Sequence, residues 1–221
     1  MSENLFADEL IRQACDDVSA RSGGNRFVEL LEAGELPRER LAWLAGEEFR
    51  IVRSDQRSFA LLASRFPDGS AGGLFLGLAQ GEARASALLL EFAAALGWDG
   101  KKLRGYAPLP FAQVYPAYLA WCALYGTRSA VAVAMAANLD EWGGYCGRIA
   151  DALTSRYRLS EEAVGFFRFF ATPPPGFMEQ AEAAVEEGLE AGEDPVEALR
   201  AAQALHVYET AFWDALVTGL D

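Results

Sequence analysis

The stretch PRERLAWLAGEEFRIVRSDQRSFALLASRF, residues 37–66, decides the fold class of this chain. At 100° per residue, its large apolar side chains fall on one face of an α-helix. That stripe consists of Leu41, Leu44, Ile51, Val52, Phe59, Leu62 and Phe66. Pro67-Asp68-Gly69 follows directly and predicts a break in the chain. The stretch therefore predicts one long helix that buries its apolar face.

The same helical period extends over the rest of the chain, and no convincing alternating strand is present. Helices are predicted near 4–20, 37–66, 70–97, 111–126, 128–157, 160–171, 176–192 and 194–218. Gly192-Glu193-Asp194-Pro195 predicts the end of one helix and the capped start of the next. No solenoid repeat or low-complexity linker divides the chain. We therefore predict an all-α fold, a single helical bundle domain over residues 1–221.

The composition restricts the classes of partner. Of the 221 residues 52% are hydrophobic, so the chain can bury a large core. Its 32 acidic and 19 basic residues give a net charge of −13, which repels nucleic-acid phosphates. No apolar run reaches the roughly 18 residues of a membrane span, and the start, MSENLFADELIRQACDDV, lacks the features of a signal peptide. We expect a cytoplasmic protein with neither a nucleic-acid nor a membrane partner.

Cysteine and histidine residues are few. Cys15, Cys122 and Cys146 form neither a disulfide framework nor a zinc pattern, and we interpret them as small buried side chains in a reducing compartment. His206 is the only histidine, and a core or capping role is expected for it. These residues predict neither a metal ion nor another cofactor.

Two acids interrupt the apolar face of the helix at 37–66. Glu48 and Asp55 lie seven residues apart, near the middle of the stripe. Acids normally avoid such a face, because burying an unpaired charge is costly. Two interpretations stay open: the acids pair with buried arginines or backbone donors, or they line a cavity.

Asn138 and Glu209 occupy comparable positions in two other helices. Asn138 lies at the centre of a face formed by Val131, Met135, Trp142, Tyr145 and Ile149. Glu209 lies on the stripe of Leu205, Tyr208, Phe212 and Leu216. A buried asparagine needs hydrogen-bond partners or a polar ligand, and a carboxyl group in apolar surroundings is typical of a general acid or base. Asp140 and Glu141 rotate outward, so we expect both to be solvated.

Three motifs resemble the TenA / thiaminase II family. Tyr208-Glu209-Thr210-Ala211-Phe212-Trp213 is similar to the family's Y-E-x-x-F-W signature near the C-terminus. Phe27 followed by Gly34-Glu35-Leu36-Pro37-Arg38-Glu39-Arg40-Leu41 looks like the family's entry to its second long helix. Tyr115-Pro116-Ala117-Tyr118-Leu119, with Gly126 eleven residues after Tyr115, also follows the family pattern. Together the motifs span roughly residues 20–216.

The resemblance implies a haem-oxygenase-like helical bundle with a pocket between helices, often assembled as a homotetramer. We therefore expect a homo-oligomer, either a dimer or a tetramer. Thiaminase II enzymes hydrolyse aminopyrimidine breakdown products of thiamin, using an aspartate that binds the pyrimidine, a nucleophilic cysteine and a glutamate that handles protons. On this sequence the pyrimidine-binding acid falls on Glu48 and the proton-handling acid on Glu209.

The remaining pocket positions follow from the same resemblance. A pocket tyrosine matches Tyr115, whereas other tyrosine positions fall on Ile51, Trp142 and, near the triple proline, Phe170. Phe212, in the C-terminal motif, is also expected to bind substrate. A relative of this fold that binds two irons uses several histidines, so the single histidine argues against a metal centre.

The catalytic cysteine of the family falls on Asn138, which cannot act as a thiolate nucleophile. Two substitutes stay open: Cys122, if it lines the cavity, and Glu141, if the register slips by three residues. The sequence thus predicts a TenA-like protein that binds a thiamin-related or similar heteroaromatic molecule. As an enzyme it would hydrolyse a C–N bond with Glu209 as general acid and base and Asn138 as an orienting group. The alternative is a non-catalytic binding, accessory or regulatory protein that retains the pocket.

Overall fold

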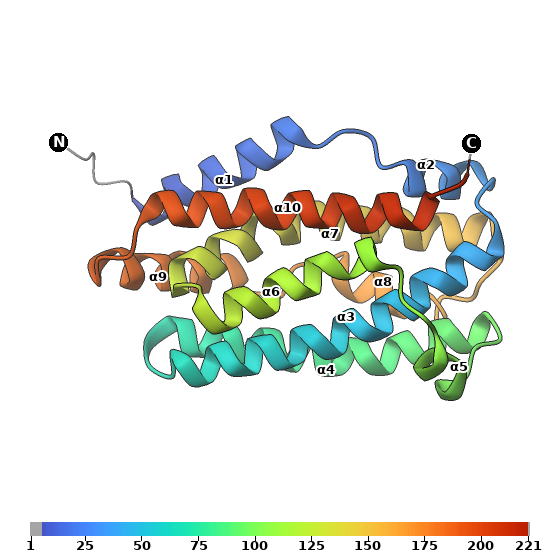
Figure 1. Cartoon of the computed structure of the whole chain (residues 1–221), viewed down its shortest axis with the longest axis horizontal. Coiled ribbons are helices and arrows are strands. Elements are labelled where there is room, and N and C mark those ends of the chain that lie inside the picture. The colour runs from blue at the N-terminus through green and yellow to red at the C-terminus, as the bar shows by residue number, and fades with distance from the viewer. Residues whose placement is uncertain (1–5, 221) are drawn as a thin grey trace.

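The computed structural model describes residues 6–220, in which every regular element is a helix (Figure 1). The all-α prediction is confirmed, and residues 4–5 of the first predicted helix lie outside the described range. The elements are α1 (Ala7–Arg21), α2 (Arg26–Ala33), α3 (Arg38–Arg65), α4 (Gly69–Ala95), α5 (Gly100–Gly105), the 3₁₀ turn η1 (Pro110–Gln113), α6 (Val114–Tyr125), α7 (Arg128–Ser155), α8 (Gly165–Phe170), α9 (Phe177–Glu190) and α10 (Pro195–Val217).

Two short helices, α2 and α5, lie in the intervals between predicted helices. α2 starts at Asn25, whose side chain accepts a hydrogen bond from the Val28 amide at 3.2 Å, and ends at Gly34, which has a φ of +77°. α5 starts at Asp99, whose carboxylate accepts from the amides of Lys101 and Lys102. With 8 and 6 residues, both helices are too short to show a periodic pattern.

The other elements follow the predicted order. α10 begins where the sequence predicts it, because Asp194 accepts from the Val196 amide at 2.9 Å and Pro195 occupies the first turn. α8 covers only part of the range predicted for it, since it starts at Gly165. No helix within residues 6–220 is both long and apolar enough to cross a membrane.

The long helices pack in two pairs, α3 with α4 and α7 with α10, and α6 lies between α3 and α10 (Figure 1). α1 and α9 cover α7 at one end of the bundle, and α2 and α8 cover it at the other. This arrangement brings the middle of α3, α4, α7 and α10 together.

The apolar core is divided into two clusters, one toward each end of the bundle. Tyr115 packs against both, so it lies at the boundary between them. The polar residues on the apolar stripes, Glu48, Asn138 and Glu209, fall near the middle of their helices, where neither cluster continues. The polar residues that interrupt the apolar stripes in the sequence therefore lie at the same height along the bundle axis.

Candidate functional site

A cavity of about 510 Å³ lies at this level. Its walls come from the middle of α3, α4, α7 and α10, and the segment from Phe169 to Gln180, which contains the triple proline, contributes to its rim. A volume of this size accommodates a small organic molecule. All eight residues predicted for the site line this cavity: Glu48, Ile51, Tyr115, Asn138, Trp142, Phe170, Glu209 and Phe212.

Four carboxyl groups face the cavity. Glu48 and Asp55 come from α3, Glu82 from α4 and Glu209 from α10. Glu48 and Asp55 are each 3% exposed and Glu209 is 5% exposed, whereas Glu82 is half-buried. Among residues 6–220 none of the four forms an ion pair. The sequence interpretation in which Glu48 and Asp55 pair with buried arginines or backbone donors is therefore wrong, because neither acid has such a partner among the described residues and both line the cavity.

Burial and mutual repulsion shift the titration of these acids. Burial raises the pKa of Glu48 well above its usual value, and Asp55, Glu209 and Glu47 raise it further. Burial likewise raises the pKa of Asp55. The hydroxyl group of Tyr115, as a hydrogen-bond donor, lowers this pKa, but the effect of burial is larger. One Asp55 oxygen, Oδ1, has no hydrogen-bond partner among the described residues. Both shifts favour the protonated form of these carboxyl groups, and a cationic ligand would favour the ionised form instead.

Asn138 and Glu209 meet across the interface of α7 and α10. Asn138 Nδ2 donates a hydrogen bond to Glu209 Oε2, and Trp213 Nε1 donates to Glu209 Oε1 at 3.5 Å. Burial nevertheless raises the pKa of Glu209 to about 8, because it outweighs both donors and the nearby Glu141 adds repulsion. A carboxyl group with this pKa carries its proton at pH 7 and can release it to a basic atom.

Aromatic rings form much of the remaining wall. Trp142 meets Phe170 edge-on, with ring centroids 5.9 Å apart, and meets Trp213 at 5.7 Å. Phe170 is positioned by a close approach of α8 to α7, because a Cβ atom on Gly143 would lie 3.1 Å from the Phe170 carbonyl oxygen. Flat rings at these angles provide an apolar surface for a planar ligand.

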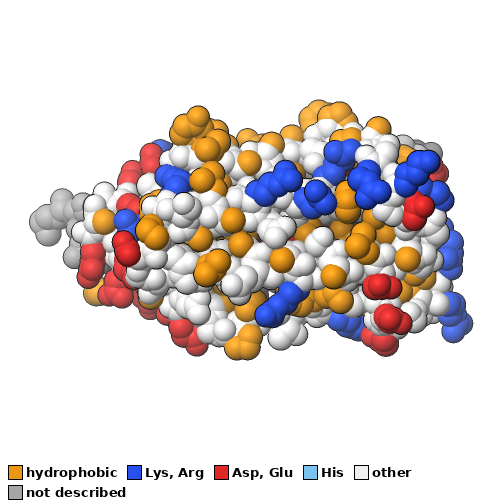
Figure 2. Space-filling model, turned by 90° about the horizontal axis from the view of Figure 1, so that it is seen from below, with side chains coloured by type: hydrophobic (Ala, Val, Ile, Leu, Met, Phe, Trp, Pro, Cys, Tyr) orange, Lys and Arg blue, Asp and Glu red, His pale blue; other side chains and the backbone are white. Residues whose placement is uncertain are grey.

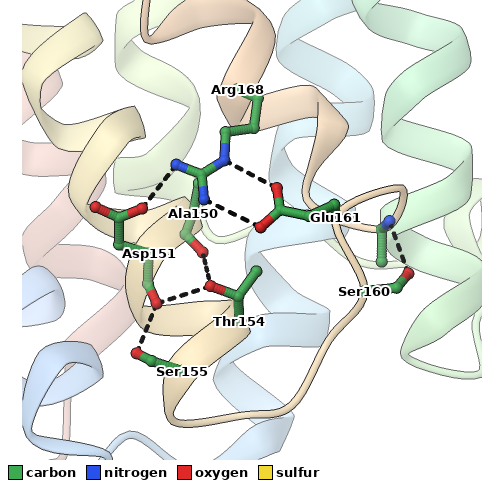
Figure 3. A network of polar contacts seen from close by, with 8 residues as sticks. Ala150, Asp151, Thr154, Ser155, Ser160, Glu161 and Arg168 are labelled. Carbon is green, nitrogen blue, oxygen red and sulfur yellow. Dashed lines mark hydrogen bonds and ion pairs between the residues drawn. The ribbon is translucent and has the colours of Figure 1, made fainter.

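An ion-pair network holds α8 on its outer side (Figure 3). Arg168 donates to Asp151 at 2.7 Å and to both oxygens of Glu161 at 3.2 and 3.3 Å. These groups are largely exposed, so each pair contributes little stability. They connect α8, whose residues Phe169 and Phe170 line the cavity, to Asp151 on α7 and to Glu161.

Glu141 does not point into solvent as predicted, because it forms a polar cluster. Its oxygens accept from Ser22 Oγ at 2.6 Å and Tyr145 Oη at 3.0 Å, and His206 Nδ1 lies 2.9 Å away. The prediction failed because α1 and its connection to α2 cover this side of α7 with polar partners. Asp140 is exposed, as predicted.

The Glu141 cluster lies behind the main cavity. Glu141 and His206 line a separate small pocket of about 90 Å³, and Glu209 lines both this pocket and the main cavity. Glu141 is thus not placed as a substitute for the missing cysteine, whereas Asn138 occupies the cavity wall. Glu209 forms the partition between the two spaces.

No cysteine side chain lines the cavity. Cys122 and Cys146 are buried, and burial raises the pKa of both thiols. Cys15, on α1, also has a raised pKa because of partial burial and the nearby Asp140. The interpretation in which Cys122 provides the nucleophile is wrong, because Cys122 does not line the cavity. Within residues 6–220 no group of three or more His, Cys, Asp or Glu side chains is arranged to hold a metal ion.

The sequence pattern did not reveal Glu82, whereas it left Asp55 open as an acid that lines a cavity. Glu82 lies four residues after Leu78 and three before Ala85, so it interrupts an apolar face as Glu48 does. The small residues around it, GGLFLGLAQGEARA, weaken the apolar stripe and hide this signal.

Solved structures share this fold. A domain of unknown function with a heme oxygenase-like fold from Shewanella denitrificans superposes with a TM-score of 0.73 and 18% identity, covering 97% of this chain and 93% of that one. A TenA homologue from P. horikoshii gives a TM-score of 0.73 and 14% identity over 96% and 98% of the two chains. A putative TenA-like thiaminase from Sulfolobus solfataricus gives 0.62 and 13% over 98% and 97%. At these identities the likeness shows the fold.

Sequence comparison covers the same region. Residues 25–219 match the model of the family described as TENA/THI-4/PQQC. This matched range includes every residue that lines the cavity. No curated protein sequence matches the chain significantly.

Proposed function

Because the chain belongs to the TENA/THI-4/PQQC family, we propose that its cavity binds a flat heteroaromatic molecule of the thiamin-related pyrimidine type. The proposal rests on four carboxyl groups around an aromatic-walled cavity that also has Arg84 in its lining, and none of the four forms an ion pair among the described residues. Such a site favours a ligand with several N–H donors or a positive charge. An aminopyrimidine has an exocyclic amino group and ring nitrogens along one edge, and Glu48 is the group proposed to hold that edge.

We propose hydrolysis of a C–N bond without a covalent enzyme intermediate. Glu209, protonated at neutral pH, gives its proton to the departing nitrogen, while a water oxygen bonds to the carbon that the nitrogen leaves. The proton that this water loses restores Glu209. Asn138, hydrogen-bonded to the Glu209 carboxyl group, holds that group in one orientation. The resulting step needs no thiol, consistent with a cavity that has none.

A non-catalytic binding protein is the second candidate. It is favoured by the same hydrogen bond, because the asparagine amide occupies one Glu209 oxygen in the absence of ligand. Such a protein would retain the affinity of the cavity and release no product. In either case we propose a cytoplasmic homo-oligomer, a dimer or a tetramer, whose mass light scattering would measure.

A thermal-shift series tests the binding proposal. The probes are thiamin, 4-amino-5-aminomethyl-2-methylpyrimidine and, as a ligand without the amino group, 2,5-dimethylpyrimidine. A ligand present at 100 times its Kd stabilises the folded state by about 2.7 kcal/mol. We expect stabilisation by an amino-substituted probe and none by 2,5-dimethylpyrimidine. Equal shifts from all three, or no shift from any, would exclude the proposed ligand class, and amine release measured by NMR separates the enzyme from the binding protein.

A further inference from the structure

A second groove of about 510 Å³ lies on the opposite side of α3, between α3, α5 and α6. Four arginines line it: Arg50, Arg53 and Arg57 from α3 and Arg104 from α5. The apolar part of its wall comes from Phe49, Leu61, Ala120, Ala123 and Leu124. It shares no lining residue with the cavity of the proposed function.

The charge of the groove is opposite to that of the molecule. The chain has a net charge of −13, yet no aspartate or glutamate lines this groove. Among residues 6–220 none of the four arginines forms an ion pair. Lys and Arg side chains gather on the face seen in Figure 2 toward the end of the molecule that carries α5, and many acids lie at the other end.

Two acids on segments that adjoin the groove already accept hydrogen bonds. Glu47 accepts from Tyr106 Oη at 2.7 Å and from the Leu109 amide at 2.6 Å. Asp99, which interacts electrostatically with Arg104, accepts from two backbone amides at the start of α5. Neither carboxylate forms an ion pair with any of the four guanidinium groups.

The arginines are arranged in a row. Arg50, Arg53 and Arg57 are spaced by three and four residues, so they share one face of α3 over about 10 Å. Arg50 Nη2 donates to the Tyr106 carbonyl at 2.7 Å, which fixes this side chain, and its Nε is buried without a hydrogen-bond partner. The Arg53 guanidinium lies 5.4 Å from the centre of the Phe49 ring.

We propose that this groove binds a small molecule that carries a diphosphate group. Guanidinium groups match phosphate oxygens two at a time, and a row of about 10 Å offers separate groups to each phosphate. The apolar wall takes the organic part of the ligand. A molecule with a net charge of −13 repels a polymer of phosphates, which restricts the ligand to a small anion.

Calorimetric titration with pyrophosphate tests the site, at constant ionic strength set with chloride. The groove variant is Arg53→Gln/Arg57→Gln, and the matched control is Arg12→Gln/Arg200→Gln. All four side chains are exposed and form no ion pair in the described part of the chain, so both variants keep the fold and lose the same charge. We expect saturable binding by the wild type and the control, and affinity about tenfold or more lower in the groove variant.

Three results would overturn the proposal: no saturable binding to the wild type, equal losses in both variants, or a change of molecular mass in the groove variant alone, which would identify a subunit interface. ADP, which adds an organic group to the same diphosphate, should bind at least as tightly as pyrophosphate. The cavity ligand is titrated into the same variants, and its affinity should not change. The proposal for the groove and the proposal for the cavity are therefore tested independently.

Discussion

At the scale of single residues, Glu209 has a strongly raised pKa. Its pKa of about 8 in the folded state exceeds the usual glutamate value of about 4.3. Between these values the folded state binds more protons than the unfolded state, so the contribution of Glu209 makes the protein less stable as pH rises. A salt-bridged acid, whose pKa is lowered in the folded state, has the opposite effect and makes the protein more stable as pH rises.

Glu209→Gln removes this dependence and keeps the shape of the side chain. We expect the variant to match the wild type near pH 5 and to exceed its free energy of unfolding at pH 8 by roughly 1–4 kcal/mol, because no charge is then buried. Urea unfolding of both proteins from pH 5 to pH 9 measures the difference. Glu186→Gln, at an exposed position of α9, is the control. A loss of several kcal/mol at every pH would instead identify Glu209 as a structural anion.

The three cysteines provide a second test at this scale. Because burial raises the pKa of all three thiols, each has little thiolate at neutral pH. We expect slow alkylation of the native protein by iodoacetamide at pH 7.5, measured by mass spectrometry. Ligand affinity or turnover should not change during the reaction. Rapid modification of one cysteine together with loss of activity would contradict the position of Asn138 as the cysteine replacement.

The sequence predicts these single residues unevenly. Glu48, Asn138 and Glu209 were found because each interrupts a strong apolar stripe. Glu82 was missed because glycines and alanines dilute the stripe around it, and Glu141 was misplaced because its partners Ser22 and His206 come from other helices. Contacts between distant segments leave no local pattern, whereas burial of one helix face does.

At the scale of elements, the contact between α7 and α8 depends on Gly143. A Cβ atom there would lie 3.1 Å from the Phe170 carbonyl, whereas a Cβ on the neighbouring Gly144 has nothing within 4 Å. Both glycines lie inside α7, so alanine improves helix propensity equally at the two positions.

This pair of glycines gives a matched prediction. Gly144→Ala should stabilise the protein by up to about 1 kcal/mol. Gly143→Ala should be less stable than Gly144→Ala by about 1 kcal/mol or more, and it should weaken cavity ligands because Phe170 moves. Urea unfolding and calorimetry on both variants measure the two effects. Equal stability of the variants would mean that α8 adjusts its position freely.

The long helices were predictable, whereas the short helices α2 and α5 were not. α3, α7 and α10 each run for more than five turns, so their periodic stripes are unambiguous in the sequence. α2 and α5 depend instead on the caps Asn25 and Asp99 and on packing against neighbouring helices. The caps are visible in the sequence, but a helix of one or two turns forms only when tertiary contacts support it.

At the scale of the whole molecule, the cavity lies between two apolar clusters, and its four acids form no ion pair among the described residues. Burial, together with the neighbouring acids, raises the pKa of Glu48 and Glu82, and burial raises that of Glu209 to about 8, so the cavity carries protons on its carboxyl groups at pH 7. A cationic ligand favours the ionised carboxylates. Binding of such a ligand must therefore release protons, and its affinity must rise with pH while the ligand keeps its charge.

Calorimetry in two buffers of different ionisation enthalpy measures this proton release at pH 7. The probe is 4-amino-5-aminomethyl-2-methylpyrimidine, and its 5-hydroxymethyl analogue, which lacks the ammonium group, is the control. We expect net release of protons with the amine, less with the alcohol, and a smaller release in Glu82→Gln, because one titrating carboxyl group is then absent. Affinity for the amine should increase from pH 6 to pH 8. The acids lie on α3, α4 and α10, so proton release requires the packed bundle that brings these helices together. Proton uptake on binding would contradict the prediction, because it would mean that the cavity acids are ionised before the ligand binds.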